Sequence, residues 1–413
     1  MKTYSTLGEI VQKYGGLVQT GPFGSQLHES DYQENGVPVV MPTDINDGRI
    51  DVSAIARISE VKASQLSRHK LKVNMIVYPR RGEITKCAFV ELSQDGFICG
   101  TGCIKIELPI DVIYPEFFYY YLNSQEVTGW LKNNAVGSTM LNLSASIFKR
   151  IKVPDIDFIT QKNISAILSN YDNLIDTNRR RIKLLEESAR LLFREWFVYF
   201  RFPGHEKVKI ADGVPEGWER IHFMSIISAI ESGGRPKGGA IDMGIPSIGA
   251  ENVNGIGNHN YSNEKYVPEE YYQRMMKGKV ISKDVLLYKD GANIGRTTLV
   301  GYGYPHDKCC VNEHVFILRT KNNIQNWLYF FLSQNFIQQS VANLNSNSAQ
   351  PGISQDKLSN LKIIFPNDEI VKLFDDITEG IVKQIFILSI QNQKLAEARD
   401  LLLPRLMSGA IEI

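Results

Sequence analysis

The sequence has no feature typical of a membrane or secreted protein. Its 413 residues contain no run of about 18 apolar side chains, and its first residues lack the apolar segment and cleavage site of a signal peptide. Cysteine is scarce: Cys87, Cys99, Cys103, Cys309 and Cys310 do not have the spacing of a disulfide framework. We therefore expect a cytoplasmic protein with reduced thiols.

Neither sign of charge is in excess. The 46 Lys and Arg residues nearly balance the 45 Asp and Glu residues, for a formal net charge of +1. Phosphate binding depends on local clusters of cations, so this balance does not exclude a nucleic-acid partner. With 43% apolar and 22% charged residues, the composition is that of a globular protein, and the length predicts at least two domains.

Recognisable catalytic motifs are also missing. We find no P-loop, dinucleotide fingerprint or nucleophile elbow, and no [DNS]-P-P-[YFW] tetrapeptide of an amino-methyltransferase. His306, Cys309, Cys310 and His314 are of the types that bind zinc, but adjacent cysteines on a strand point to opposite faces, and the first half has no matching histidine pair. We expect no catalytic residue and no metal ligand; stoichiometric zinc would revive an enzymatic interpretation.

The sequence does contain an internal repeat. After a shift of about 210 positions, GVPVVMPTDI from Gly36 matches GIPSIGAENV from Gly244, and the segment around Tyr78 matches that around Tyr288. FFYYYLNSQ matches WLYFFLSQN, and LNLSASIFKRIKVP matches PGISQDKLSNLKIIFP. Chance similarity does not keep its register over so many segments, so the repeat indicates a duplication.

Each copy has a strand-rich part followed by a long helix. Stretches with few helix breakers predict helices from about Asp157 to Tyr199 and from about Asn367 to Leu403, where Pro404 would end the second. Heptad spacing of mostly apolar residues predicts that the two helices pack on each other; the alternative is two unrelated surface helices on separate cores. The stripe consists of Ile164, Tyr171, Asn178, Leu185 and Leu192, and of Phe374, Ile381, Leu388, Leu395 and Leu402.

These elements predict an α+β protein with a pseudo-twofold internal repeat. Globular α/β domains are expected at residues 1–155 and 217–365, and helical regions at 156–200 and 366–413. The Pro-, Gly- and charge-containing segment 201–216 is interpreted as a linker.

Polar loops recur at matching places in the two copies. DNA recognition needs cations for phosphates, and amide, hydroxyl or guanidinium groups for base edges. Any one of these loops would be interpreted as a solvated tip, but loops that recur with different residues are expected when one scaffold reads two sequences. The candidates are Gln19, Thr20, Ser25, Gln26, Thr43, Asp44, Arg80, Arg81, Lys86, Ser138 and Thr139 in the first copy, and Arg235, Lys237, Glu251, Asn252, Lys289, Asn293, Arg296, Asn345, Ser346 and Asn347 in the second. The run 179–181, three arginines, is left open between a solvated face, a DNA contact and a contact with an acidic partner.

Four segments taken together carry a family resemblance: TGPFGSQL followed by GVPVVMPTDI, then SARLLFREWFVYFRFP, GVPEGWERI and RDLLLPRLMSGAI. With them the chain resembles, over essentially its whole length, the specificity (S) subunit of type I restriction-modification enzymes. The resemblance implies two target-recognition domains alternating with two helical regions that pair as an antiparallel coiled coil. Each domain would read one half of a bipartite, asymmetric site in double-stranded DNA, and the helical spacer would set the gap between the halves.

The resemblance also implies partners. Two methyltransferase (modification) subunits and the restriction (endonuclease and translocase) subunits would supply the chemistry, with S-adenosylmethionine, ATP and Mg bound to them, and this chain would be non-catalytic and cofactor-free. Two alternatives stay open: the specificity subunit of a related type II restriction-modification system, and a duplicated protein–protein scaffold.

Overall fold

The structure is a computed structural model that describes residues 4–46, 48–82, 84, 86–137, 142–344 and 352–411. The chain divides into two compact units: unit 1 comprises Met1–Asn173 with Ala396–Ile413, and unit 2 comprises Leu174–Leu395. Each unit contains one globular head and a part of each long helix. Among the described residues, no helix has the length and apolar character needed to cross a membrane.

The head of unit 1 is built on two four-stranded sheets. The main sheet has the order β2-β11-β8-β9 with antiparallel neighbours, and the second has the order β10-β4-β7-β3 with β10 parallel to β4. β1 pairs with β12, and β5 pairs with β6. The strands are β1 (Tyr4–Thr6), β2 (Leu17–Thr20), β3 (Tyr32–Gln33), β4 (Val37–Val40), β5 (Ile45–Asn46), β6 (Arg49–Ile50), β7 (Arg57–Ile58), β8 (Ile76–Pro79), β9 (Ala88–Phe89), β10 (Ile98–Cys99), β11 (Cys103–Glu107) and β12 (Lys152–Pro154). The helices are α1 (Leu7–Tyr14), α2 (Glu60–Gln65), α3 (Pro115–Leu122), α4 (Gln125–Asn134) and α5 (Ala145–Lys149).

The head of unit 2 repeats this plan. Its main sheet has the order β16-β22-β19-β20, its second sheet the order β18-β17-β21 with β21 parallel to β17, and β15 pairs with β23. The strands are β13 (Ile210–Ala211), β14 (Val214–Pro215), β15 (Glu219–His222), β16 (Ile227–Ser232), β17 (Ile245–Ile248), β18 (Lys265–Val267), β19 (Val285–Tyr288), β20 (Thr297–Leu299), β21 (Cys310–Val311), β22 (Val315–Thr320) and β23 (Lys362–Phe365). The helices are α7 (Glu269–Arg274), α8 (Gln325–Leu332), α9 (Asn335–Asn343) and α10 (Gln355–Ser359).

The two strand orders confirm the duplication that the sequence predicts. β2, β11, β8 and β9 correspond to β16, β22, β19 and β20, and a parallel pair recurs as β10–β4 and β21–β17. α3 and α4 are separate helices, because the Ser124 hydroxyl caps a new helix by accepting from the Val127 amide. All five cysteines are buried free thiols.

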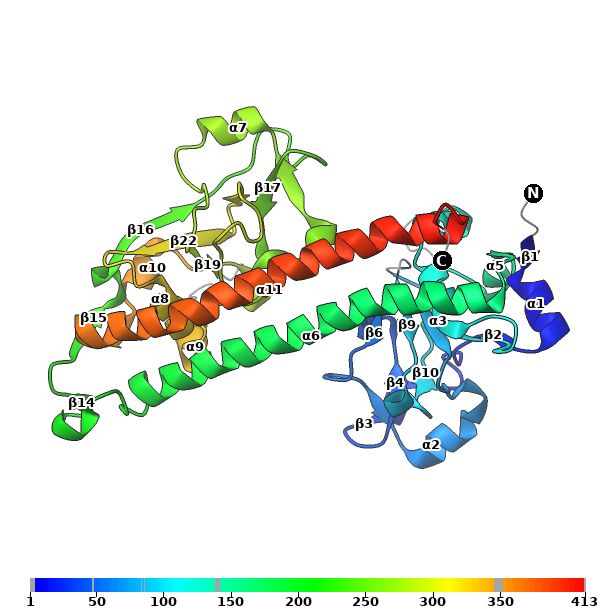
Figure 1. Ribbon diagram of the computed structural model, residues 1–413. Coiled ribbons are helices and arrows are strands. Elements are labelled where there is room, and N and C mark those ends of the chain that lie inside the picture. The colour runs from blue at the N-terminus through cyan, green and yellow to red at the C-terminus, as the bar shows by residue number, and fades with distance from the viewer. Residues whose placement is uncertain are drawn as a thin grey trace. The chain divides into compact units, whose positions relative to one another are not determined.

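Two long helices, α6 (Phe158–Phe197) and α11 (Asp368–Ser408), confirm the predicted helical regions (Figure 1). Both begin with a side-chain N-cap. The Asp157 carboxylate accepts from the Thr160 amide at 3.0 Å, and the Asn367 amide oxygen accepts from the Ile370 amide at 3.0 Å. These N-caps satisfy backbone donors that the first turn of a helix leaves unpaired.

Within each unit the two helix segments pack antiparallel. In unit 2 the end of α6 meets the start of α11, since the rings of Phe193 and Phe374 are 5.6 Å apart. In unit 1 the start of α6 meets the end of α11, where Asp172 pairs with Arg399 and Leu168 shares a core with Leu403. Every residue of the predicted heptad stripe is buried or half-buried.

The prediction that Pro404 ends the second helix is wrong, because α11 continues to Ser408. A proline inside a helix removes one backbone hydrogen bond. Leu403, Leu406 and Met407 are buried in the core of unit 1, and this burial stabilises the helix past the proline.

The segment 201–216 is folded rather than extended. It contains the β13–β14 hairpin, and its Phe202 and Val214 are buried with Trp218 in the core of unit 2. As a linker between domains it stays a prediction.

The shared core predicts a large effect of a single truncation. Phe374 is fully buried against Phe193, Phe197 and Phe330, so Phe374→Ala is expected to lower the free energy of unfolding by about 3–5 kcal/mol, through lost burial and a cavity. The control Ile387→Ala, on the same helix and 50% exposed, should change it by less than about 0.5 kcal/mol. Urea unfolding followed by circular dichroism measures both; equal effects would contradict the shared core.

Candidate nucleic-acid interface

In unit 1, the ends of three strands meet at the turn formed by residues 100–102. The Gly100 amide donates to the Val40 carbonyl at the end of β4 (2.9 Å). The Gly102 carbonyl accepts from the Arg80 amide after β8 (2.8 Å). Gly21, which follows β2, donates to the Cys103 carbonyl just after the turn (2.9 Å). Three loops that lie far apart in the sequence therefore converge on one edge of the head.

In unit 2, the turn formed by residues 312–314 has the same place. The Asn312 amide donates to the Ile248 carbonyl at the end of β17 (3.0 Å). The His314 carbonyl accepts from the Lys289 amide after β19 (3.1 Å). At the end of β16, the Ser232 hydroxyl donates to the carbonyl of Glu313, the middle residue of the turn (3.3 Å). Two of the three contacts at this edge are thus the same backbone hydrogen bonds in both heads, and the third differs.

Two glycines allow the loops to approach this closely. A Cβ atom on Gly21 would lie 1.9 Å from the Gly100 carbonyl oxygen, and one on Gly233 would lie 1.6 Å from the Val311 oxygen. Both distances are far below van der Waals contact, so no other residue fits these positions without moving the backbone.

Described residues that follow the predicted positions 138–139 and 345–347 also contact this edge. The Leu143 amide donates to the Arg80 carbonyl (2.8 Å), and the Ile353 amide donates to the Lys289 carbonyl (2.9 Å). These contacts place the segments that flank 138–141 and 345–351 beside the loops after β8 and β19. Ser138, Thr139, Asn345, Ser346 and Asn347 themselves lie outside the described residues.

We name the two surfaces by their residues. Loop cluster 1 comprises the described residues of 19–26, 41–44, 80–86 and 100–102, and loop cluster 2 comprises residues 233–237, 249–252, 289–296 and 312–314. Candidate residues with exposed side chains are Ser25, Gln26, Thr43 and Arg81 in loop cluster 1, and Arg235, Lys237, Glu251, Asn293 and Arg296 in loop cluster 2. Gln19, Thr20, Asp44, Arg80, Lys86 and Lys289 are half-buried.

Some candidate side chains are engaged in holding the loops. The Asp44 carboxylate, whose pKa is raised by burial, accepts from the Met41 amide at 2.8 Å. Asn252 is 3% exposed, and its amide oxygen accepts from the Asn260 amide at 2.9 Å. The carboxamide of Gln26 accepts from the Phe23 amide at 3.2 Å. Loop-holding contacts of this kind fix the backbone that presents the exposed residues.

The cations of the two clusters differ in their surroundings. In loop cluster 1, the Arg80 Nε atom is buried and has no hydrogen-bond partner among the described residues, while burial and the charge of Arg81 lower the pKa of Arg80. In loop cluster 2, Arg235 pairs with Glu313 (2.8 Å) and Arg296 donates to Asn254 (3.0 Å). A buried donor without a partner is uncommon in folded proteins.

The sequence analysis missed the central turn of loop cluster 2 as part of the interface. There the His314 imidazole pairs with Asp290 (2.8 Å) and lies 3.2 Å from Glu313, whose Oε2 is buried without a partner in the described part of the chain. Of these residues, only His314 was a candidate in the sequence, and only as a zinc ligand. In the internal repeat, residues 312–314 correspond to the turn 100–102, since both turns directly precede the matching strands β22 and β11.

The four zinc-type residues of HDKCCVNEH do not form a site. Among the described residues, the only group of three candidate ligand atoms within 4.8 Å of one another consists of His259, Glu264 and His306. Cys310 instead contacts the Pro246 carbonyl (3.7 Å), and His314 pairs with its carboxylate partner.

Comparisons with known proteins agree with this fold. The family model for the type I restriction modification DNA specificity domain matches the chain twice, over residues 3–187 and 215–388. The MjaIX specificity subunit of a type I restriction enzyme from Methanocaldococcus jannaschii is 24% identical, over 93% of this chain and 88% of that protein. The MjaVIII specificity subunit from the same organism is 24% identical, over 78% of this chain and 76% of that protein.

A solved structure has the same fold. The crystal structure of the type I restriction-modification system S subunit from M. genitalium aligns with a TM-score of 0.53 at 16% identity, over 98% of this chain and 96% of that one. Because two family matches cover most of its length, the chain belongs to the type I restriction modification DNA specificity family. It is a DNA-recognition, specificity subunit of a type I restriction-modification system that carries two copies of the family's domain.

The close approach at Gly21 yields a matched test of the convergence. Gly21→Ala is expected to lower the free energy of unfolding by about 1–3 kcal/mol, because the added methyl group collides with backbone. Gly24→Ala, in the same loop but with open space around the added atom, should change it by less than about 0.5 kcal/mol. Thermal unfolding of the two variants measures the difference, and indistinguishable melting curves would contradict the packing described.

Proposed function

We propose that loop clusters 1 and 2 each read one half of a bipartite, asymmetric site in double-stranded DNA, and that the long helices set the gap between the halves. The observation that carries this proposal is one backbone frame with two sets of side chains. The turn of loop cluster 1 is Gly-Thr-Gly, whereas that of loop cluster 2 is Asn-Glu-His. A shared frame with different groups on it is expected when two heads of common origin read different sequences.

The exposed groups have the chemistry for both parts of the task. Arg81 of loop cluster 1, and Arg235 and Lys237 of loop cluster 2, would contact phosphates or guanine edges, because cations are suited to both. Asn293 would pair with an adenine edge, and the hydroxyl of Thr43 with either base or phosphate.

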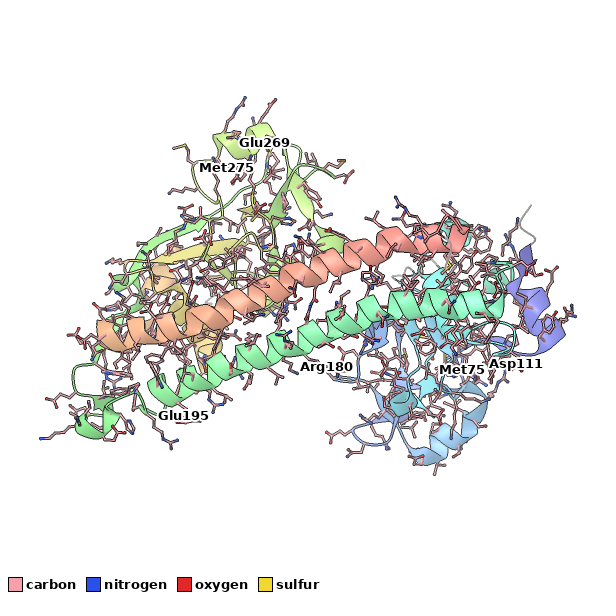
Figure 2. The ribbon with its side chains drawn as sticks, viewed as in Figure 1. Met75, Asp111, Arg180, Glu195, Glu269 and Met275 are labelled. Carbon is pink, nitrogen blue, oxygen red and sulfur yellow. The ribbon has the colours of Figure 1, made fainter. Side chains whose placement is uncertain are left out.

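The long helices supply a stiff spacer. The 40 residues of α6 correspond to about 60 Å of helix at 1.5 Å per residue. Their outer faces would also receive partner subunits. Arg180 on α6 is exposed (Figure 2). Arg179 and Arg181, its neighbours in the sequence, are exposed too, and Arg179 lies 3.7 Å from Asp176. The alternatives for these arginines stay a solvated face, a DNA contact and a contact with an acidic partner.

The proposal places all chemistry on other chains. Two modification subunits would flip and methylate adenines with S-adenosylmethionine, and restriction subunits would use ATP and Mg to translocate and cleave. This chain would contribute no catalytic residue and bind no cofactor of the reaction, and it would work in the cytoplasm, where the DNA is.

Single substitutions should affect one half of the recognised site. In the reconstituted complex with modification subunits, Arg81→Ala is expected to weaken selection in one block of a randomised DNA library, and Asn293→Ala in the other, each by about 1–3 kcal/mol. Lys132→Ala, exposed on α4 of unit 1, is the control and should leave both blocks unchanged. Sequencing of the bound DNA provides the readout.

Two outcomes would overturn the assignment. If Arg81→Ala and Asn293→Ala altered the same block, the heads would not read separate halves. If neither altered any block while the complex still selected DNA, recognition would lie outside the two loop clusters.

A further inference from the structure

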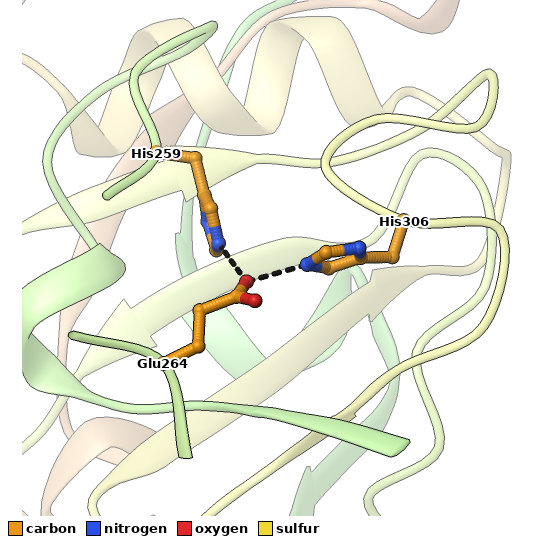
Figure 3. A group of neighbouring side chains, drawn as sticks. All are labelled: His259, Glu264 and His306. Atoms are coloured by element: carbon orange, nitrogen blue, oxygen red, sulfur yellow. Dashed lines mark hydrogen bonds and ion pairs between the residues drawn. The ribbon is translucent and has the colours of Figure 1, made fainter. Parts of the chain in front are cut away.

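In the unit 2 head, a triad of two histidines and one glutamate connects the loop 253–264 to the loop 301–309. The Nε2 atoms of His259 and His306 each lie 2.5 Å from the same oxygen, Oε1 of Glu264 (Figure 3). The His259 and Glu264 side chains are 3% and 5% exposed, and the His306 side chain is 22% exposed. Three groups that bind transition metals are therefore directed at one point, with solvent access from one side.

The second oxygen of the carboxylate is held separately. The Tyr266 hydroxyl donates to Oε2 of Glu264 at 2.9 Å, which leaves Oε1 for the two imidazoles. A hydrogen bond to the outer oxygen of a ligating carboxylate is a common second-shell contact in metal sites.

We propose that His259, Glu264 and His306 bind a zinc ion that fastens the loop 253–264 to the loop 301–309. Two imidazole nitrogens and one carboxylate oxygen form a known ligand set for zinc, with water in the fourth position. Tetrahedral coordination at about 2.0–2.2 Å separates neighbouring ligand atoms by about 3.3 Å, so Oε1 needs to withdraw by less than about 1 Å from its present place. A water molecule completes the site from the exposed side of His306.

A comparison of the two heads explains why only one needs the ion. In unit 1 the loop between β4 and β7 is closed by backbone pairing of β5 with β6. Residues 253–264, all of which the structure describes, contain no strand between β17 and β18. The equivalent segments of the first copy, 41–56 and 91–98, contain no histidine. Side chains of the triad thus hold the loop of unit 2 in place, whereas backbone pairing holds the corresponding loop of unit 1.

The test uses the full chain without a histidine tag, analysed for metal after purification and again after chelation and titration with Zn²⁺ or Co²⁺. About one zinc ion per chain is expected, and Co²⁺ should produce the visible absorption of a tetrahedral site. His259→Gln and Glu264→Gln should each lower the affinity for Zn²⁺ by about tenfold or more, and Tyr266→Phe by about tenfold. Chelation should lower the melting temperature of the wild-type chain but not that of His259→Gln.

The matched control is His314→Gln, which removes another histidine–carboxylate pair of the same head, at 2.8 Å from Asp290. This variant should keep the zinc. Circular dichroism shows which variants fold. If His259→Gln does not fold, Glu264→Gln takes its place in the test.

Three results would overturn the proposal. A wild-type chain that binds neither Zn²⁺ nor Co²⁺ would reduce the triad to a hydrogen-bonded cluster. Unchanged binding by the folded His259→Gln and Glu264→Gln variants would place the ion elsewhere, and loss of zinc in His314→Gln alone would assign it to the HDKCCVNEH cluster. None of these readouts involves DNA, so the zinc site and the proposed recognition can fail independently.

Discussion

The structure depends on a core that the head and the long helices of each unit share. In unit 2, Phe374 of α11 and Phe193 of α6 pack with Phe330 of α8, and α8 in turn covers the main sheet. In unit 1, Leu168 of α6 and Leu403 of α11 belong to the same cluster as Phe117 of α3. Because sheet and helix are buried together, the strand ends that carry the loop clusters are fixed to the helices without a flexible joint inside a unit.

In the two heads the backbone of the central turns is alike, whereas the side chains on these turns differ. The hydrogen bonds that tie the turns 100–102 and 312–314 to the ends of β4 and β17, and to the residues after β8 and β19, join backbone amides and carbonyls. They do not depend on side-chain identity. The side chains on these frames can therefore change without loss of the fold. Asn252 and Asp44 show the limit of this freedom, because both satisfy backbone amides of their own loops.

Much of this architecture could be predicted from the sequence because its signals are local or repeated. The starts of the long helices near Asp157 and Asn367, the heptad stripe and the matched strands depend on short-range pattern. Because the sequence is duplicated, each of these features occurs twice. The central turn of loop cluster 2 was missed although the repeat matches it with residues 100–102. The His259–Glu264–His306 triad could not be predicted, because its members come from distant loops and it has no counterpart in the first copy. The extent of α11 was misjudged since burial of Leu406 and Met407 outweighs the local effect of Pro404.

The central claim is that this chain directs adenine methylation to a two-part DNA sequence. The most direct measurement is genome-wide mapping of methylated adenine in cells with the gene present and with it deleted, both with active modification subunits. The account predicts that deletion removes methylation from one motif, made of two short blocks with a fixed gap. An unchanged methylation map, or loss of a single continuous motif, would contradict it.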